Sequence, residues 1–248
     1  TIRQNLASRS SKQLPSGYRL VRLNSAIAKQ LQATAPLENK NNRSATAAVA
    51  VPFNMPLPDG SLLGSSFYES PILSRELQSQ LAHVKTYEMV GAKKKSMGRI
   101  TITPEGVSGI LFTDKGSVYI APVGKEYPDV HMVYLVKDLK TDVPIMCGVK
   151  EELDKKTSDD AKVNFGDCQL RTYRLAVAAT GEYTAWAGNQ TNALTYITIS
   201  VNNVIAIYQK EVAITFTLVT NNSIIFPNAA TDGWDPGGSP TNEDLDDT

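Results

Sequence analysis

The residues best suited to chemistry are the cysteines, of which 248 residues contain only two, Cys147 and Cys168. Pro144 favours an extended backbone before Cys147, and Gly148 lets the backbone approach a partner closely just after it. The residue types alone allow one disulfide bridge, two free thiols or a metal ligand, and Cys147 can equally be a small buried side chain.

The segment around Cys147 reads Val-Pro-Ile-Met-Cys-Gly-Val from Val143 to Val149. It resembles the Pro-Lys-Met-Cys-Gly-Val cysteine switch in prodomains of reprolysin-like (adamalysin-type) zinc metallopeptidases, and it departs from that pattern at Ile145. The resemblance implies that Cys147, flanked by Pro144, Met146 and Gly148, is an inhibitory zinc ligand. A thiolate in the open fourth position of a catalytic zinc displaces the water that the zinc would activate.

Two broader stretches carry the same resemblance. Short segments between about residues 45 and 140, such as Pro58-Asp59-Gly60 and Tyr68-Glu69-Ser70-Pro71, are similar to prodomains of bacterial members of the family. The segment from Asp167 to Tyr183 is similar to the opening strand of their catalytic domain. The resemblance thus implies a secreted zymogen whose prodomain blocks its own downstream catalytic domain and whose substrates, after activation, are proteins or peptides.

The zinc-binding string of these enzymes, His-Glu-x-x-His-x-x-Gly-x-x-His, is missing from the sequence. The only histidines, His83 and His131, have no second ligand at helical spacing, and we expect both to be structural. The chain is therefore expected to contain no catalytic residue, to bind no zinc by itself and to be an inactive fragment, with the zinc helix beyond Thr248.

Hydrophobic periodicity indicates an α+β fold with two unequal domains. A β-rich prodomain occupies residues 1–150, a charged linker residues 151–166, and the incomplete catalytic domain residues 167–248. Near the start, Ser25–Gln32 favours a helix and Glu38–Ser44 an exposed loop. The strands predicted for the prodomain are Ala45–Phe53, Phe67–Glu69, Arg99–Thr103, Val107–Phe112, Ser117–Ala121 and Val130–Val136, the last at the centre of its sheet.

In the second domain, Thr172–Thr180 and Val212–Thr220 alternate like strands, and the long segment Thr191–Gln209 between them is more typical of a helix. Strand, helix and strand then form the start of an α/β metzincin domain. Lys155-Lys156 in the linker, or Arg171 just beyond it, offers a basic site for a processing enzyme, and self-cleavage is equally compatible with the sequence.

Composition excludes some functions. Basic and acidic residues are balanced at 25 each, so no net field attracts nucleic acid or an anionic membrane surface. No apolar run approaches the roughly 20 residues that a bilayer requires. The competing hypothesis is a non-enzymatic, secreted, β-rich binding or adhesion module, since no catalytic constellation is complete.

Overall fold

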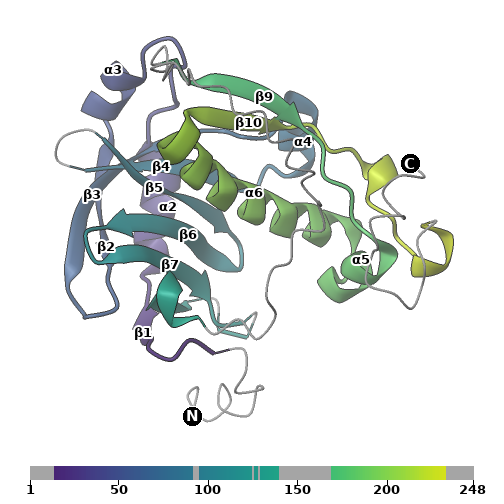
Figure 1. Cartoon of the computed structure of the whole chain (residues 1–248), viewed down its shortest axis with the longest axis horizontal. Helices are drawn as coiled ribbons and strands as arrows, with labels where there is room; N and C mark the ends of the chain where they lie inside the picture. Colours follow the sequence, from purple (N-terminus) through teal and green to yellow (C-terminus); the bar gives the residue numbers. More distant parts are fainter. Residues whose placement is uncertain (1–13, 92–94, 125, 128, 140–168, 233–248) are drawn as a thin grey trace, which may run out of the picture.

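The computed structural model describes residues 14–91, 95–124, 126–127, 129–139 and 169–232. These residues form an eight-stranded antiparallel sheet, a separate two-stranded parallel sheet and several helices, in agreement with the α+β prediction (Figure 1). None of the described helices is long and apolar enough to cross a bilayer.

The large sheet comes from the N-terminal part of the chain. Its strands are β1 (Arg19–Arg22), β2 (Val51–Pro56), β3 (Leu62–Glu69), β4 (Lys85–Val90), β5 (Ser96–Thr103), β6 (Gly106–Thr113), β7 (Gly116–Pro122) and β8 (Val130–Leu135). Strands β2 to β8 follow one another as a meander, and β1 adds to the outer edge of β8. Tight turns such as Pro58-Asp59-Gly60, where Gly60 has φ of 91°, fix the register of the hairpins.

Alternation along the strands gives the sheet two different faces. One face is apolar and packs with Leu31 of helix α2 (Ser25–Thr34) around a core that includes Phe67, Tyr87, Met89, Ile100, Leu111 and Val133. The opposite face carries polar side chains and is covered by the long helix α6 (Gln190–Val212), as Figure 1 shows.

The C-terminal part supplies β9 (Arg171–Leu175), α5 (Gly181–Ala187), α6 and β10 (Ile214–Leu218). The two strands pair in parallel, as the strand-helix-strand prediction requires. Short 3₁₀ turns follow β8 (η2, Val136–Asp138) and β10 (η3, Asn222–Ile224; η4, Ala229–Thr231). Asn189 caps the start of α6 by accepting a hydrogen bond from the Asn192 amide at 2.8 Å.

A second hydrophobic core contains residues from both parts of the chain. Helix α4 (Arg75–Gln80) and its neighbours provide Ile72, Leu73, Leu77, Leu81 and Val84, and the C-terminal part provides Ala179, Leu194, Ile197, Val201, Ile205, Leu218 and Ile225. Backbone pairing joins the same regions, because the Leu218 amide donates to the Ile72 carbonyl at 2.7 Å and the Ser74 amide to the Leu218 carbonyl at 2.9 Å.

Two sequence-based predictions need correction. Residues Arg43–Ala48 form helix α3 rather than the start of a strand, because alanine favours helix and Asn42 caps the first turn. The segment Glu38–Ser44 is largely exposed, as predicted, although Glu38 and Arg43, near its two ends, form an ion pair. Strand β8 lies second from the edge of the sheet, because residues 19–22 pair along its outer side.

Gly98 in β5 should not tolerate a side chain. Its φ of 143° lies in a region that favours glycine, and an added Cβ would collide with the Ile110 carbonyl oxygen. We expect Gly98→Ala to lower the free energy of unfolding by about 1–3 kcal/mol, measured by urea denaturation. Gly64→Ala is the control, because its Cβ would meet only Asn54 Oδ1 at 3.9 Å. Equal effects of the two changes would contradict this account.

Candidate functional site

The four residues of the predicted switch, Pro144, Met146, Cys147 and Gly148, lie outside the described residues, as does Cys168. Their role as an inhibitory segment stays a prediction. The described residues do place both histidines.

His131 is a structural residue of β8, with only 1% of its surface exposed. Its Nε2 accepts a hydrogen bond from the Val107 amide at 2.8 Å, which requires that nitrogen to be unprotonated. Nδ1 lies 3.3 Å from the Asp129 carbonyl oxygen and is placed to donate to it. Burial lowers the pKa of His131 below its usual value, so the imidazole is neutral and joins two strands.

The lowered pKa of His131 predicts a loss of stability in mild acid. Below about pH 6.5 the unfolded chain binds a proton that folded His131 does not, so stability present above that pH is lost as the pH falls. The slope from this residue is at most about 1.4 kcal/mol per pH unit. Denaturant unfolding between about pH 7 and 5 should show a flatter profile for His131→Gln, with His83→Gln as the control. If His131→Gln loses stability with falling pH as steeply as the wild type does, His131 is not the group responsible for the pH dependence.

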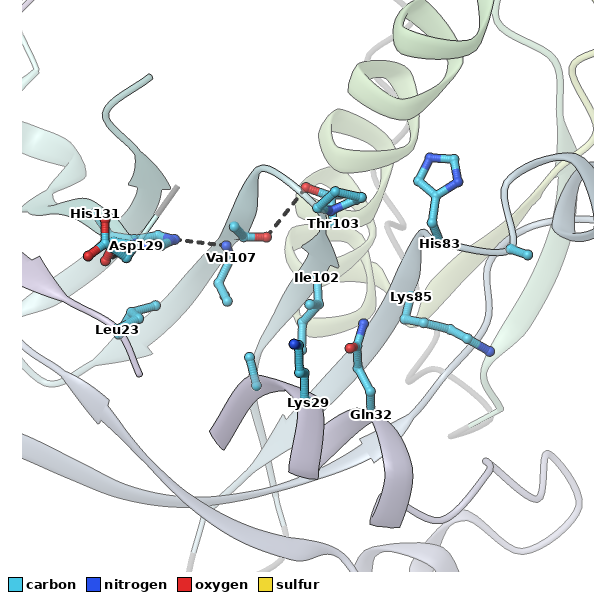
Figure 2. Close-up of a pocket in the computed structure, with 14 residues that line it drawn as sticks. Leu23, Lys29, Gln32, His83, Lys85, Ile102, Thr103, Val107, Asp129 and His131 are labelled. Carbon is cyan, nitrogen blue, oxygen red and sulfur yellow. Dashed lines mark hydrogen bonds between the residues drawn. The ribbon is translucent and has the colours of Figure 1, made fainter. Parts of the chain in front are cut away.

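His83 and His131 line the same cavity of about 690 Å³, together with Lys29, Lys85 and Asp129. Figure 2 shows the two imidazoles on different sides of this cavity, with Val107 and Thr103 between them. Among the described residues no group of three or more His, Cys, Asp or Glu side chains could hold a metal ion. His131 also uses both ring nitrogens elsewhere. These residues therefore do not fit a zinc site.

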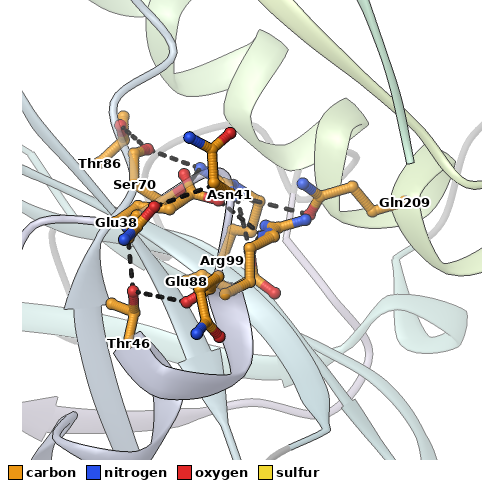
Figure 3. Close-up of polar contacts among 11 residues, drawn as sticks. Glu38, Asn41, Thr46, Ser70, Thr86, Glu88, Arg99 and Gln209 are labelled. Atoms are coloured by element: carbon orange, nitrogen blue, oxygen red, sulfur yellow. Dashed lines mark hydrogen bonds and ion pairs between the residues drawn. The ribbon is translucent and has the colours of Figure 1, made fainter. Parts of the chain in front are cut away.

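The most developed polar cluster lies instead where the large sheet meets α6 (Figure 3). At its centre the side chain of Arg99, on β5, is completely buried. Nε donates to Asn202 Oδ1 of α6 at 2.7 Å, and Nη2 donates to the Ser70 carbonyl oxygen at 2.8 Å and to Ser70 Oγ at 2.9 Å. Nη1 donates to Glu88 Oε2 at 3.2 Å and to Gln209 Oε1 at 3.4 Å. Each of the five N–H groups of the guanidinium thus has an acceptor.

The charges around Arg99 balance. Glu88 lies directly opposite Arg99 on β4 and also pairs with Arg43, whose Nε is 2.6 Å from Glu38 Oε1. Ser70 Oγ donates to Glu38 Oε2 at 2.7 Å and so closes the ring of contacts. Burial lowers the pKa of Arg99 and the Glu88 carboxylate raises it, but an arginine in this setting stays charged. We call Arg99, Glu88, Arg43, Glu38 and Ser70 the Arg99 cluster.

Asn202 connects this cluster to the helix. Its Nδ2 donates to the Ile100 carbonyl oxygen and to Thr101 Oγ1, each at 3.0 Å, and Asn202 is fully buried. Thr198, Asn202 and Ala206 follow at four-residue spacing and therefore lie on one face of α6. That face packs on the sheet, while Leu194, Ile197, Val201 and Ile205 face the second hydrophobic core.

A polar cavity of about 510 Å³ lies beside the cluster, lined by residues of both parts of the chain. Glu38, Arg43 and Ser70 form one side, and Thr172, Gln209 and Thr215 form the other. The cavity marks the seam where the two parts of the chain meet.

Sequence reasoning missed the Arg99 cluster because a strand that alternates apolar and polar residues usually turns its polar face to water. One available signal was the pair Asn202-Asn203 within an apolar stretch, since a buried amide requires partners. The partners lie about a hundred residues away and became visible only in the fold.

Comparison with known families finds a match for the C-terminal part of the chain. No curated protein matches the chain. Residues 169–247 match the family model of the Metallo-peptidase family M12B, Reprolysin-like. The match includes β9, α5, α6 and β10, and α6 provides the Asn202 and Gln209 side chains that contact Arg99. Residues 169–247 of this chain are therefore similar to the reprolysin-like metallopeptidases of family M12B.

Proposed function

We propose that the chain is the zymogen part of a secreted, zinc-dependent endopeptidase. In this proposal residues 1–150 inhibit the peptidase and Cys147 is the inhibitory zinc ligand. Residues 167–248 begin the catalytic domain, whose remainder is the partner of the inhibitory part, and the activated enzyme cleaves proteins or peptides.

The observation that carries the proposal is the contact between the β-rich part and the metallopeptidase segment. Helix α6, which lies within the family match, is buried between the large sheet on one side and the second hydrophobic core on the other. An inhibitory prodomain must bind its own catalytic domain, and this extensive packing is consistent with that requirement.

Peptidases of this family depend on zinc, but the described residues supply no zinc site and the sequence has only two histidines. The contribution of this part of the chain is therefore binding and inhibition. We expect it to have no peptidase activity by itself.

Activation would follow cleavage of the chain between the two parts. Lys155-Lys156 provides a basic site in the predicted linker. Arg171 is a poorer site, because it is the first residue of β9 and pairs with Ile214 of β10. A protease requires an unpaired, extended backbone at the bond it cuts.

The test uses the protein extended beyond Thr248. We expect its sequence to contain the histidine motif that is missing here, and its cleaved form to hydrolyse a protein substrate in a manner that a chelator abolishes. The uncleaved form should be much less active. If the extended protein lacks the motif and shows no hydrolysis after cleavage, the proposal is wrong and a non-enzymatic binding module becomes the better description.

A further inference from the structure

The face of the large sheet beneath α6 is an unusual surface to bury. Several cross-strand pairs on it are polar, since Glu88 faces Arg99, Thr86 faces Thr101, and Thr101 faces Ser108. All five of these side chains are at most 6% exposed. An apolar partner would leave Arg99 Nε and Thr101 Oγ1 without the hydrogen bonds that α6 supplies. Because an unpaired buried polar group is costly, the surface favours a partner with matching polar groups.

Helix α6 has those groups at the required positions. Asn202 is both acceptor and donor to the sheet, with hydrogen bonds of 2.7 to 3.0 Å to Arg99, Ile100 and Thr101. Gln209, two turns further along, accepts from the same guanidinium. A helix with an apolar residue in place of Asn202 would bury the Arg99 charge with an unpaired donor, so the surface discriminates between helices.

Two further side chains of α6 contact the large sheet and its turns, one on each side of Asn202 along the helix. Tyr196 hydroxyl lies 3.0 Å from Glu105 Oε2 in the β5–β6 turn. Lys210 Nζ lies 4.4 Å from the ring centroid of Phe112 on β6. Together with the second hydrophobic core and the pairing of Leu73 with Leu218, they join the two parts of the chain independently of the segment between residues 139 and 169.

From this interface we infer that the polar face of the sheet is a recognition surface for α6, and that it holds the β-rich part on the metallopeptidase segment after the connecting chain is cut. Cleavage alone then does not release the β-rich part, and release is a separate step. The inference adds a stage to the proposed activation, but it requires neither zinc nor peptidase activity.

The experiment uses the 248-residue chain with a recognition site for a sequence-specific protease inserted between Lys155 and Lys156. After complete cutting, the two pieces are analysed by size-exclusion chromatography at micromolar concentration without denaturant. We expect them to elute together at the volume of the uncut chain. Separate elution of two folded pieces would overturn the inference, whatever the extended protein does as a peptidase.

Two neighbouring amides then test the recognition itself. Asn202→Leu removes the contact with Arg99 and should weaken binding between the cut pieces at least about tenfold. Asn203→Leu is the matched control, because Asn203 makes only a 3.3 Å hydrogen bond to the Tyr119 hydroxyl and its Oδ1 has no partner. Equal retention in both variants would refute a role for Asn202.

Circular dichroism of each uncut variant checks that it folds. If Asn202→Leu does not fold, Arg99→Lys replaces it, since lysine keeps the charge but cannot reproduce the planar fork of donors. We again expect at least about tenfold weaker binding between the cut pieces. Binding unchanged by Arg99→Lys would show that the surface does not select its partner through this fork.

Discussion

Replacing Glu88 with glutamine is expected to lower the free energy of unfolding by about 3–5 kcal/mol. The change keeps the shape of the side chain but removes the carboxylate shared by Arg99 and Arg43. Arg99 is completely buried, so water cannot replace the lost charge. Urea denaturation of the 248-residue chain measures the loss, and a shared core predicts one cooperative transition for both parts.

The control for Glu88→Gln is Asp59→Asn, which removes the carboxylate of an ion pair with Lys115 at 2.8 Å. Both of these side chains are open to solvent, so water and salt take over the lost interaction and the unfolding midpoint should barely move. A similar, small effect of both substitutions would mean that the Arg99 cluster contributes little to stability.

The loss of stability expected for Glu88→Gln is the cost of removing one partner from the Arg99 cluster. It does not measure how much the whole cluster stabilises the fold. Bringing four charged groups out of water is costly, and a well-packed apolar substitute can be as stable. What the charges add is selectivity, because each wrong partner leaves one of them unsatisfied. The cluster therefore explains why this sheet accepts α6 better than it explains how stable the chain is.

Secondary structure was largely predictable where periodicity was strong. The strands around Arg99–Thr103, Val107–Phe112 and Ser117–Ala121 were predicted from alternation and are found as β5, β6 and β7. Helix α6 was predicted in spite of its many β-branched residues, which lower helix propensity. Its burial on two sides stabilises it, because tertiary packing outweighs propensity.

The tertiary relationship between the two parts could not be predicted in the same way. Arg99 and Glu88 stand at positions that alternation assigns to the solvent face of a strand, and that face is in fact covered. Their burial depends on Asn202, about a hundred residues later, and no local pattern encodes such a contact. The helix at Arg43–Ala48 was missed for a different reason, because its three alanines were read as the start of a strand and its capping Asn42 as part of a loop.

The second large effect is expected for Cys147→Ala in the protein extended beyond Thr248. If Cys147 is the inhibitory ligand, alanine cannot replace its thiolate, and hydrolysis of a peptide by the uncut protein should rise at least about tenfold. Cys168→Ala is the control and should leave the uncut protein inhibited. The measurement is the initial rate before any cleavage, verified by electrophoresis.

The rate at which the Cys147 thiol is alkylated tests its role as a metal ligand without depending on catalysis. A thiolate bound to a metal is protected from alkylation, so in the uncut, extended protein Cys147 should react slowly and should become reactive after chelation. Fast alkylation before chelation, or no gain of activity in Cys147→Ala, would show that Cys147 is not the inhibitory ligand.

The docked sheet and Cys147 would then be separable contributions to inhibition. Comparing Cys147→Ala with the double variant Cys147→Ala, Asn202→Leu, both uncut, distinguishes them. If docking through Asn202 also restricts access of substrate, the double variant should be the more active of the two; if Cys147 alone is responsible, their rates should be equal. A faster double variant would show that docking through the Arg99 cluster also restricts access of substrate, and equal rates would assign the inhibition to Cys147 alone.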